Sequence, residues 1–469
     1  MALHRHLVKL CAAAVFLAAV AGLPFSLEQS VHAPLAVWLA VVAVLVAVLL
    51  GLARWLLARR PWTPPGTDGQ WLLALCAVAL LPRILWVLVA DTVPISDFAD
   101  YRNLAQTLCH AHRFGVDQAS AFRPVGWPFA LSVLDCAGLD LPRWGGLLNT
   151  VLQAATVPAI FLWARDLAGR RAALAASLLF ALWPAQIVGC SLLATEPLFT
   201  VLLTWVLYLA SRLPAARRPW LLAVALGVLV AGAVYVRATA LPLPIALAAV
   251  AVLGRRWPWR LLAQHALILV VALLCLLPWG LRNQREMGRF SLTTSNEGAT
   301  LILGNSDHAD GRYIDAELRP FVPDVPGEMA QDAAARAVAH AWIAQHPLRF
   351  LALIPRKWLA LWGPEFSEAG WAMCGPRWEA LRETAMGVSE AYLLLALALA
   401  ALAARRLPLQ RVTDPACALL LLFFAVHVLF HGQDRFHAPM VPVLCLLAGA
   451  GFAARDAPGL RLHTPRVVQ

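Results

Sequence analysis

Three acidic residues stand where hydrophobic runs end or begin. In PISDFADYRN, residues 94–103, Asp97 and Asp100 are three residues apart. Glu196 follows in LLATEPLF, at the start of another apolar stretch. A positioned carboxylate can take a proton from a hydroxyl nucleophile. The structural alternative for all three is a place at a helix start, as an N-cap or as an acid in the first turn.

Arginines occur in the same kind of position. Arg123, Arg237, Arg282 and Arg435 lie in AFRPVGW, VYVRATA, PWGLRNQ and HGQDRFHAP. The planar guanidinium group binds phosphate through two hydrogen bonds, and its alternative here is snorkelling to lipid headgroups. Acids alone would indicate a cation site, and arginines alone an anion site. The mixture predicts a reaction in which a carboxylate activates a hydroxyl while guanidinium groups hold a phosphate.

Histidines and cysteines give weaker patterns. His431, Asp434 and His437 have a spacing of three, but a metal site would need a fourth ligand. The nine cysteines include no CxxC motif. Cys109 and Cys136 would pair if their segment faces an oxidising space, and a free pair is the alternative. We therefore predict no dedicated metal site from these residues.

The elements that must position these residues are membrane-spanning helices. Of the 469 residues, 61% are hydrophobic and only 14% charged, and the mean hydropathy is +0.69. Apolar windows of about 20 residues recur along the chain, which is the length of a helical span. Lipid leaves no water for backbone groups, so helices are expected. We predict an all-α polytopic membrane protein with about 12 spans, at 8–24, 33–57, 70–90, 145–164, 172–189, 194–211, 220–236, 238–254, 261–279, 384–404, 413–431 and 438–454.

Charge assigns the two sides of the membrane. The runs RWLLARR, RDLAGRR, SRLPAARRP, RRWPWR and RRLPLQR fall in alternate loops, and both ends of the chain are basic. The positive-inside rule then makes these loops and both termini cytoplasmic. All the acids and arginines above fall on the outer side. The net charge of +11 is explained by topology signals, so we expect no nucleic-acid partner.

The predicted organisation has two long outer loops. The N-terminus resembles a signal peptide but is interpreted as a retained first span. The second long loop contains an amphipathic helix, AQDAAARAVAHAWIAQHP, and an interfacial helix at 349–363. The predicted parts are two additional N-terminal transmembrane helices (1–58), a cytoplasmic linker (59–69), a core with the first outer loop at 91–143 (70–279), the second outer loop (280–383), and C-terminal helices with a short cytoplasmic tail (384–469).

Taken together, the motifs resemble a known family. SDFADYRNLAQTL, AFRPVGWPFAL, LLATEPLFTVLL, AVYVRATALPLP, PWGLRNQREMGRF and QDRFHAPMVPVLCLLAG occur in this order within about residues 70–455. They are similar to bacterial GT-C glycosyltransferases of the family-39, dolichyl-phosphate-mannose-protein mannosyltransferase-like branch, which includes aminoarabinose transferases. The resemblance implies a GT-C fold. It also implies inverting transfer of a sugar from a polyprenyl-phosphate donor to a lipid, glycan or protein hydroxyl.

The resemblance also assigns roles. In relatives, the acid that opens a D-x-x-x-Y pattern in the first outer loop is the candidate base, which here is Asp97, with Tyr101 completing the pattern. The second acid that often follows is replaced by Phe98, so Asp100 either substitutes for it or caps the helix. Arg123, before Pro124, matches the residue that contacts donor phosphate. The other three arginines are expected to share that role.

Further expectations concern the acceptor and the setting. Glu196 is expected to help in catalysis or to place the acceptor or a cation. Tyr101, Asn305 and Tyr313 are expected on the acceptor side. No cofactor is obligatory, although a divalent cation remains open. The predicted location is the bacterial inner membrane, among membrane lipids, with the active site facing the periplasm. The alternatives are a surface-polysaccharide polymerase or ligase, and a lipid or sugar transporter.

Overall fold

The computed structural model describes residues 65–254, 259–313, 324–406 and 413–453, with a few isolated positions before residue 65. The predicted spans 8–24 and 33–57 and most of the predicted linker lie outside the described residues. Within the described ranges the regular elements are helical, apart from one bridge between Arg312 and Gly432. The all-α prediction is confirmed for this part of the chain.

The long apolar helices occur where the hydropathy pattern predicts them. They are α3 (Asp68–Ala90), α6 (Leu141–Ala168), α7 (Arg170–Ala181), α8 (Pro184–Val188) with η1 (Gly189–Ser191), α9 (Glu196–Arg212) with η2 (Leu213–Ala215), α10 (Pro219–Val236), η3 (Ala238–Ala240), α11 (Leu243–Gly254), α12 (Trp259–Met287), α17 (Glu379–Arg406), α18 (Thr413–Leu429) and α19 (Val441–Ala453).

Fewer of these helices are long enough to cross a membrane than the ten predicted spans that fall in the described residues. In the described residues, six qualify by length and composition, or seven if the bent pair Arg170–Ala181 and Pro184–Ser191 is one span. That pair is bent by 54°. Pro184, which has no backbone N–H, begins the second helix of the pair and interrupts the hydrogen-bond ladder of the first. Hydropathy windows do not register such a break.

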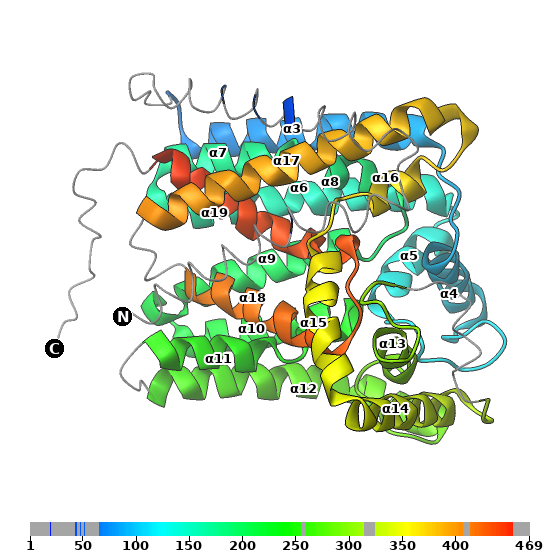
Figure 1. Ribbon diagram of the computed structural model, residues 1–469. Coiled ribbons are helices and arrows are strands. Elements are labelled where there is room, and N and C mark those ends of the chain that lie inside the picture. The colour runs from blue at the N-terminus through cyan, green and yellow to red at the C-terminus, as the bar shows by residue number, and fades with distance from the viewer. Residues whose placement is uncertain are drawn as a thin grey trace.

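The remaining elements gather at one end of the bundle. Figure 1 shows the long helices lying side by side, with the shorter helices at one end and α15 crossing the bundle direction. Both segments predicted to be long loops therefore lie at the same end of the molecule. The elements at this end are α4 (Asp97–Ala111), α5 (Gly126–Cys136), α13 (Glu297–Gly304), α14 (Glu328–Gln345), α15 (Pro347–Leu361), α16 (Ser367–Ala372), η5 (Pro376–Trp378) and η6 (Asp434–Met440).

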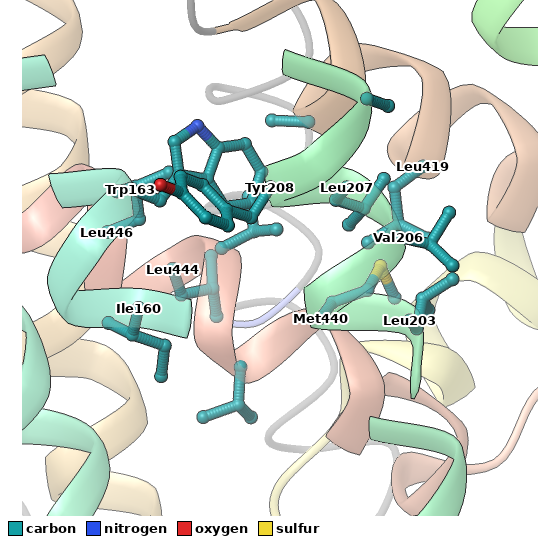
Figure 2. Packing of buried hydrophobic residues seen from close by; sticks show 14 of the residues in the cluster. Ile160, Trp163, Leu203, Val206, Leu207, Tyr208, Leu419, Met440, Leu444 and Leu446 are labelled. Carbon is teal, nitrogen blue, oxygen red and sulfur yellow. The ribbon is translucent and has the colours of Figure 1, made fainter. Parts of the chain in front are cut away.

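The apolar core centres on α9. Figure 2 shows its Leu203, Val206 and Leu207 meeting Leu419 of α18 and Met440 of η6, with α6 and α19 on the other side. Packing must be close because association in lipid depends on van der Waals contact rather than on a hydrophobic driving force. This core anchors the ends of α9 and η6, which both carry site residues.

Two covalent or polar ties fix the segment that carries Asp97. A disulfide joins Cys109 of α4 to Cys136 of α5, which is one of the two alternatives that the sequence left open. Glu328 of α14 accepts hydrogen bonds from Ser120 Oγ at 2.6 Å and from the Ala121 N–H at 2.7 Å. It also accepts one from Ser295 Oγ. The segment is therefore held against the 280–383 segment as well as against its own helices.

Candidate active site

Asp97 is the first residue of α4, but its carboxylate binds arginine side chains. Asp97 Oδ1 lies 2.6 Å from Nη2 of Arg123, and Oδ2 lies 3.4 Å from Nη2 of Arg435. Ser96, the N-cap, makes no side-chain capping hydrogen bond. The side chain of Asp97 is about a quarter exposed. Asp97 therefore links two arginines that are more than 300 residues apart in sequence.

Arg123 holds both acids of the PISDFADYRN stretch. Its Nη2 and Nε donate to Asp100 Oδ2 at 2.8 and 3.1 Å, in addition to the contact with Asp97. The guanidinium also lies 5.9 Å from the ring centre of Tyr101, which is buried. Burial opposes the charge of Arg123, but nearby Tyr101, Asp97 and Asp100 raise its pKa overall. Burial and the Asp97 charge likewise raise the pKa of the Tyr101 hydroxyl.

Glu196 is the second acid around which arginines converge. Its Oε1 accepts from Arg237 Nη2 at 2.5 Å and from Arg435 Nε at 2.8 Å. Arg237 also donates from Nε to Thr195 Oγ1 at 3.0 Å. Arg237 is the residue at which α10 ends, so the apolar helices α9 and α10 bring these groups together.

Arg435 connects the two acid centres into one network. Nearly all of its side chain is buried, where a charge is costly unless paired. Burial works against its charge, but Glu196 and Asp97 raise the pKa of Arg435, so it remains protonated. We call the connected set the acid–arginine network: Asp97, Asp100, Arg123, Glu196, Arg237 and Arg435.

The neighbours of Arg435 fix its direction. The guanidinium lies 5.0 Å from the ring centre of Trp371 and 5.7 Å from that of Phe98. The preceding residue, Asp434, accepts hydrogen bonds from the backbone N–H groups of Phe366 and Ser367, both at 2.8 Å. Asp434 thus ties η6 to the start of α16, a positioning role that the sequence did not reveal.

Arg282 stands apart from the network. Its Nη1 donates to the carbonyl oxygen of Ser120 at 2.7 Å, and its Nη2 to that of Phe114 at 2.8 Å. Its guanidinium also lies 5.0 Å from the ring centre of Trp279. The structure therefore brings together three of the four predicted phosphate-binding arginines and uses the fourth to hold the backbone of the 91–143 segment.

The residues expected on the acceptor side fall in different environments. Tyr101 lies under Arg123 in the network. Asn305 is buried and accepts from Lys357 Nζ at 2.8 Å, away from the acids. Tyr313 is partly exposed, with its ring centre 5.4 Å from that of His431. Of the three, only Tyr101 contacts the network.

The spaced histidines do not converge on one point. His437 Nε2 lies 3.1 Å from Glu365 Oε1, and its Nδ1 lies 2.7 Å from the carbonyl oxygen of Leu361. Asp434 is engaged with α16. In the described residues, the one group with the proximity of metal ligands is Cys109, His110 and Asp135, and Cys109 is in the disulfide.

A narrow pocket opens beside Glu196 and Arg435. It also contacts Glu368 of α16, Phe98 and Trp371. Burial, and then the charges of Asp434 and Glu365, raise the pKa of Glu368 to about 8. Sequence reasoning missed Glu368, although PEFSEAGW does place two acids beside an aromatic residue in the second long segment.

Comparison with known proteins gives one family match. Residues 143–281 match the family model of dolichyl-phosphate-mannose-protein mannosyltransferases. This stretch contains Glu196 and Arg237, and it ends one residue before Arg282. None of the curated proteins matches the chain.

Solved structures similar to this chain include an archaeal oligosaccharyltransferase and ArnT. The Archaeoglobus fulgidus oligosaccharyltransferase AglB, in complex with an inhibitory peptide and a dolichol-phosphate, is 14% identical, with a TM-score of 0.48. The match covers 81% of this chain and 50% of that one, so this chain spans about half the length of the archaeal protein. ArnT from Cupriavidus metallidurans, bound to undecaprenyl phosphate, is 13% identical, with a TM-score of 0.40 and coverage of 83% and 79%.

The family match lies in the helices that carry Glu196 and Arg237, the two network residues that come from α9 and the end of α10. The described part of the chain has six or seven helices capable of crossing a membrane. Over residues 143–281, this multi-helix membrane protein is similar to the dolichyl-phosphate-mannose-protein mannosyltransferase family.

Proposed function

We propose that this protein transfers a sugar from a polyprenyl-phosphate donor to a hydroxyl group of a lipid, glycan or protein, with inversion at the anomeric carbon. The acid–arginine network is the observation that carries the proposal. It joins three acids and three arginines from five separate stretches of the chain in one cluster. Such a cluster at the end of apolar helices is costly unless it serves a polar substrate.

The arginines suit a phosphate monoester or diester. Arg123, Arg237 and Arg435 each contact a carboxylate through side-chain nitrogens, and none is tied to a backbone carbonyl by a hydrogen bond in the described structure. A phosphate oxygen can replace a carboxylate oxygen in such a contact because both accept charge-assisted hydrogen bonds. The donor phosphate is therefore proposed to bind among these three guanidinium groups.

Phosphate binding would also release the base. With Asp97 paired to Arg123 at 2.6 Å, its lone pairs face a guanidinium rather than an acceptor hydroxyl. When the donor phosphate takes over the contact with Arg123, the Asp97 carboxylate becomes free to accept a proton. The protein thus gains a base only after the donor has bound.

The reaction then follows as a single displacement. The acceptor oxygen attacks the anomeric carbon and its proton passes to Asp97, while the bond from that carbon to the phosphate oxygen breaks. The electron pair leaves on the phosphate, where the arginines hold the charge. Glu196 is buried between Arg237 and Arg435, and we assign it the positioning of these two groups.

The outer face of the bacterial inner membrane is the proposed location of this site. The basic loops at the opposite end of the predicted spans support that orientation. The disulfide between Cys109 and Cys136 also supports it, because disulfides persist in oxidising compartments.

A transfer assay tests the proposed function. The purified protein in detergent is incubated with polyprenyl-phosphate sugars labelled in the sugar, and with a cell-envelope extract as the source of acceptors. We expect label to move to an acceptor and free polyprenyl phosphate to appear in equal amount. Transfer only from polyprenyl-pyrophosphate oligosaccharides would instead favour a polysaccharide polymerase or ligase. Movement of unreacted donor across vesicles without transfer would favour a transporter.

A further inference from the structure

The pocket beside the acid–arginine network has a lining unlike that of the network itself. Its walls are mostly apolar, and its polar lining comes from α6, α8, α9, α16 and η6. The polar side chains are Gln153, Gln186, Glu196, Ser367, Glu368 and Arg435. Gln153, Gln186 and Ser367 are uncharged, and the charges of Glu196 and Arg435 are paired with each other. Such a largely apolar lining suits a carbohydrate better than a free ion.

Two oxygen atoms in this lining are buried without a hydrogen-bond donor. Gln153 is only 2% exposed, and its Nε2 donates to Gln186 Oε1 at 2.6 Å, which fixes the orientation of its amide. Gln153 Oε1 is then left without a partner, and Glu368 Oε2 also lacks one in the part of the chain that the structure describes. Buried polar atoms normally have partners, so these two oxygens point to a hydrogen-bonding group from outside the protein.

The size of the pocket limits that donor group. About 20 Å³ is open to the centre of a water-sized group. This is enough for a water molecule or a hydroxymethyl group, but not for a whole sugar ring. A ring would have to remain at the mouth, beside Arg435 and Trp371, and extend one substituent inward.

The charges around the pocket disfavour other occupants. A phosphate would meet acceptor oxygens, so it belongs at the arginines instead. A metal cation would lie next to the guanidinium of Arg435, which also lines the pocket. The pKa of Glu368, raised to about 8 by burial and then by Asp434 and Glu365, leaves this side chain largely uncharged at neutral pH. A neutral hydroxyl group remains as the matching ligand.

On these grounds we infer that the pocket receives the primary hydroxyl group of a hexose and so selects the sugar that is transferred. This inference rests on the proposed transferase function and adds the class of sugar to it. Gln153 and Glu368 are the specificity-determining residues. The hydroxyl would donate its one hydrogen to Gln153 Oε1 and accept a hydrogen bond from the neutral carboxyl group of Glu368.

Gly189 offers a way to narrow the pocket without removing a polar group. Its backbone conformation, φ −62° and ψ −18°, is one that alanine adopts readily. A Cβ atom at this position would lie 3.1 Å from Cγ of Glu368. Gly189→Ala would therefore displace the end of Glu368 and is expected to reduce use of hexose donors by about five- to tenfold.

The test compares three polyprenyl-phosphate donors: a hexose, its 6-deoxy analogue and the pentose that lacks this carbon. We expect the unaltered protein to prefer the hexose in kcat/KM by more than about tenfold, because a site built around a hydroxyl rejects an analogue without it. Gln153→Leu and Glu368→Leu should each bring this ratio close to one, mainly by lowering kcat/KM for the hexose. Gln264→Leu, which removes a buried glutamine from α12, is the matched control and should retain the preference.

The outcomes separate the inference from the function on which it rests. Transfer without a preference for the hexose, or a preference that survives both pocket variants, overturns the pocket assignment and leaves the transferase function standing. If a chelator abolishes transfer, and added Mg²⁺ restores it only when Glu368 is present, the pocket is a cation site instead. Absence of transfer from every donor overturns both.

Discussion

Arginine meets the segment that carries Asp97 in two places, and its partners differ. In the acid–arginine network, Arg123 and Arg435 contact the side chain of Asp97. At the other place, Arg282 bonds to the backbone carbonyls of Phe114 and Ser120. Arg123 and Arg435 each use Nη2 at Asp97, whereas Arg282 uses Nη1 and Nη2. The sequence alone did not distinguish the two places.

This difference in partners indicates two roles: the network arginines are suited to binding a ligand, and Arg282 supports the backbone. A carboxylate can exchange its guanidinium partner for a phosphate oxygen and gain a function when it is released. A backbone carbonyl that loses its donor gains nothing and leaves a polar group unpaired, which costs about 1–3 kcal/mol when buried. We therefore expect changes in the network to lower transfer strongly, and changes at Arg282 to lower stability with little effect on transfer.

The largest expected effect is that of Asp97→Asn. Removing the base should lower the rate of transfer by roughly 10²–10⁴-fold, the contribution typical of general base catalysis. Asparagine has nearly the same size, so the fold and donor binding should be retained. The rate is measured with labelled donor and donor affinity by equilibrium binding. Asp100→Asn, which alters the more exposed acid beside Arg123, serves as the control and should lower the rate by less than about tenfold.

A folded Asp97→Asn protein that binds donor and transfers at the normal rate would show that Asp97 is not the base. Asp100→Asn with the larger loss would move that role to Asp100.

Arg435→Gln is expected to have the next largest effect. It removes a charge that contacts both Asp97 and Glu196, so transfer should fall by roughly 10²–10³-fold, as for the loss of one charge-stabilising donor. The free energy of unfolding should fall by roughly 3 kcal/mol, because Glu196 remains buried with one arginine fewer. Thermal unfolding in detergent and the transfer assay measure the two effects.

Arg123→Gln separates the loss of transfer from the loss of stability, since the side chain of Arg123 is more exposed than that of Arg435. It should weaken donor binding with a smaller loss of stability. Equal losses of stability in both variants would mean that burial is not the relevant difference between the two arginines.

Arg282→Gln should lower stability with little effect on transfer, unlike Arg435→Gln, which should lower both. The unfolding free energy should fall by roughly 1–3 kcal/mol, since two backbone carbonyls lose their charged donor. Donor KM should stay within about twofold and the rate within about tenfold, because no contact with the network is lost. Saturation kinetics over a range of donor concentrations measures both. A rise of donor KM as large as that in Arg123→Gln would place Arg282 in the phosphate site and remove the distinction.

The smallest expected effect is a dependence of the unfolding free energy on pH, caused by the buried His437 and Glu365 pair. Burial opposes the charge of His437, but the hydrogen bond and charge of Glu365 raise its pKa from 6.5 to about 9. The contribution of protonated His437 to the free energy of unfolding is complete below pH 6.5 and is lost as the pH rises towards 9. Between pH 6.5 and 8 the loss should be roughly 2 kcal/mol. Thermal unfolding at these pH values measures it.

Two variants isolate this contribution. His437→Gln should flatten the fall in stability, whereas Glu368→Gln should flatten only the part due to Glu368, whose raised pKa gives a change of the same sign. Lys357, with a pKa lowered to about 8 by burial, contributes a rise in stability only above that pH. An unchanged slope in His437→Gln would contradict the assignment.

Hydropathy and charge predicted much of the architecture. The positions of the long helices from α3 to α18 follow from apolar windows, because lipid demands continuous apolar surface. The break before Pro184 and the short α11 reduced the number of helices that qualify as spans, since local backbone geometry is not contained in a hydropathy average. The gathering of Asp97, Glu196 and Arg435 could be expected because topology placed them at one face.

Other features required three-dimensional contacts. Arg282 has the same sequence context as the other arginines, but its partners are backbone carbonyls, which have no sequence signature. Gln153 lies within an apolar helix, where a single amide gives no pattern. Glu368 becomes notable only beside Asp434, which lies in a segment distant in sequence from Glu365 and Glu368.

The most direct test of the central claim is a structure determined by electron cryomicroscopy with polyprenyl phosphate bound. The account predicts phosphate oxygens within about 3 Å of guanidinium nitrogens of Arg123 and Arg435. It also predicts that the 2.6 Å contact between Asp97 and Arg123 is broken, while Arg282 remains on its two carbonyls. A phosphate bound at Arg282, or bound elsewhere with the Asp97–Arg123 contact intact, would contradict the account.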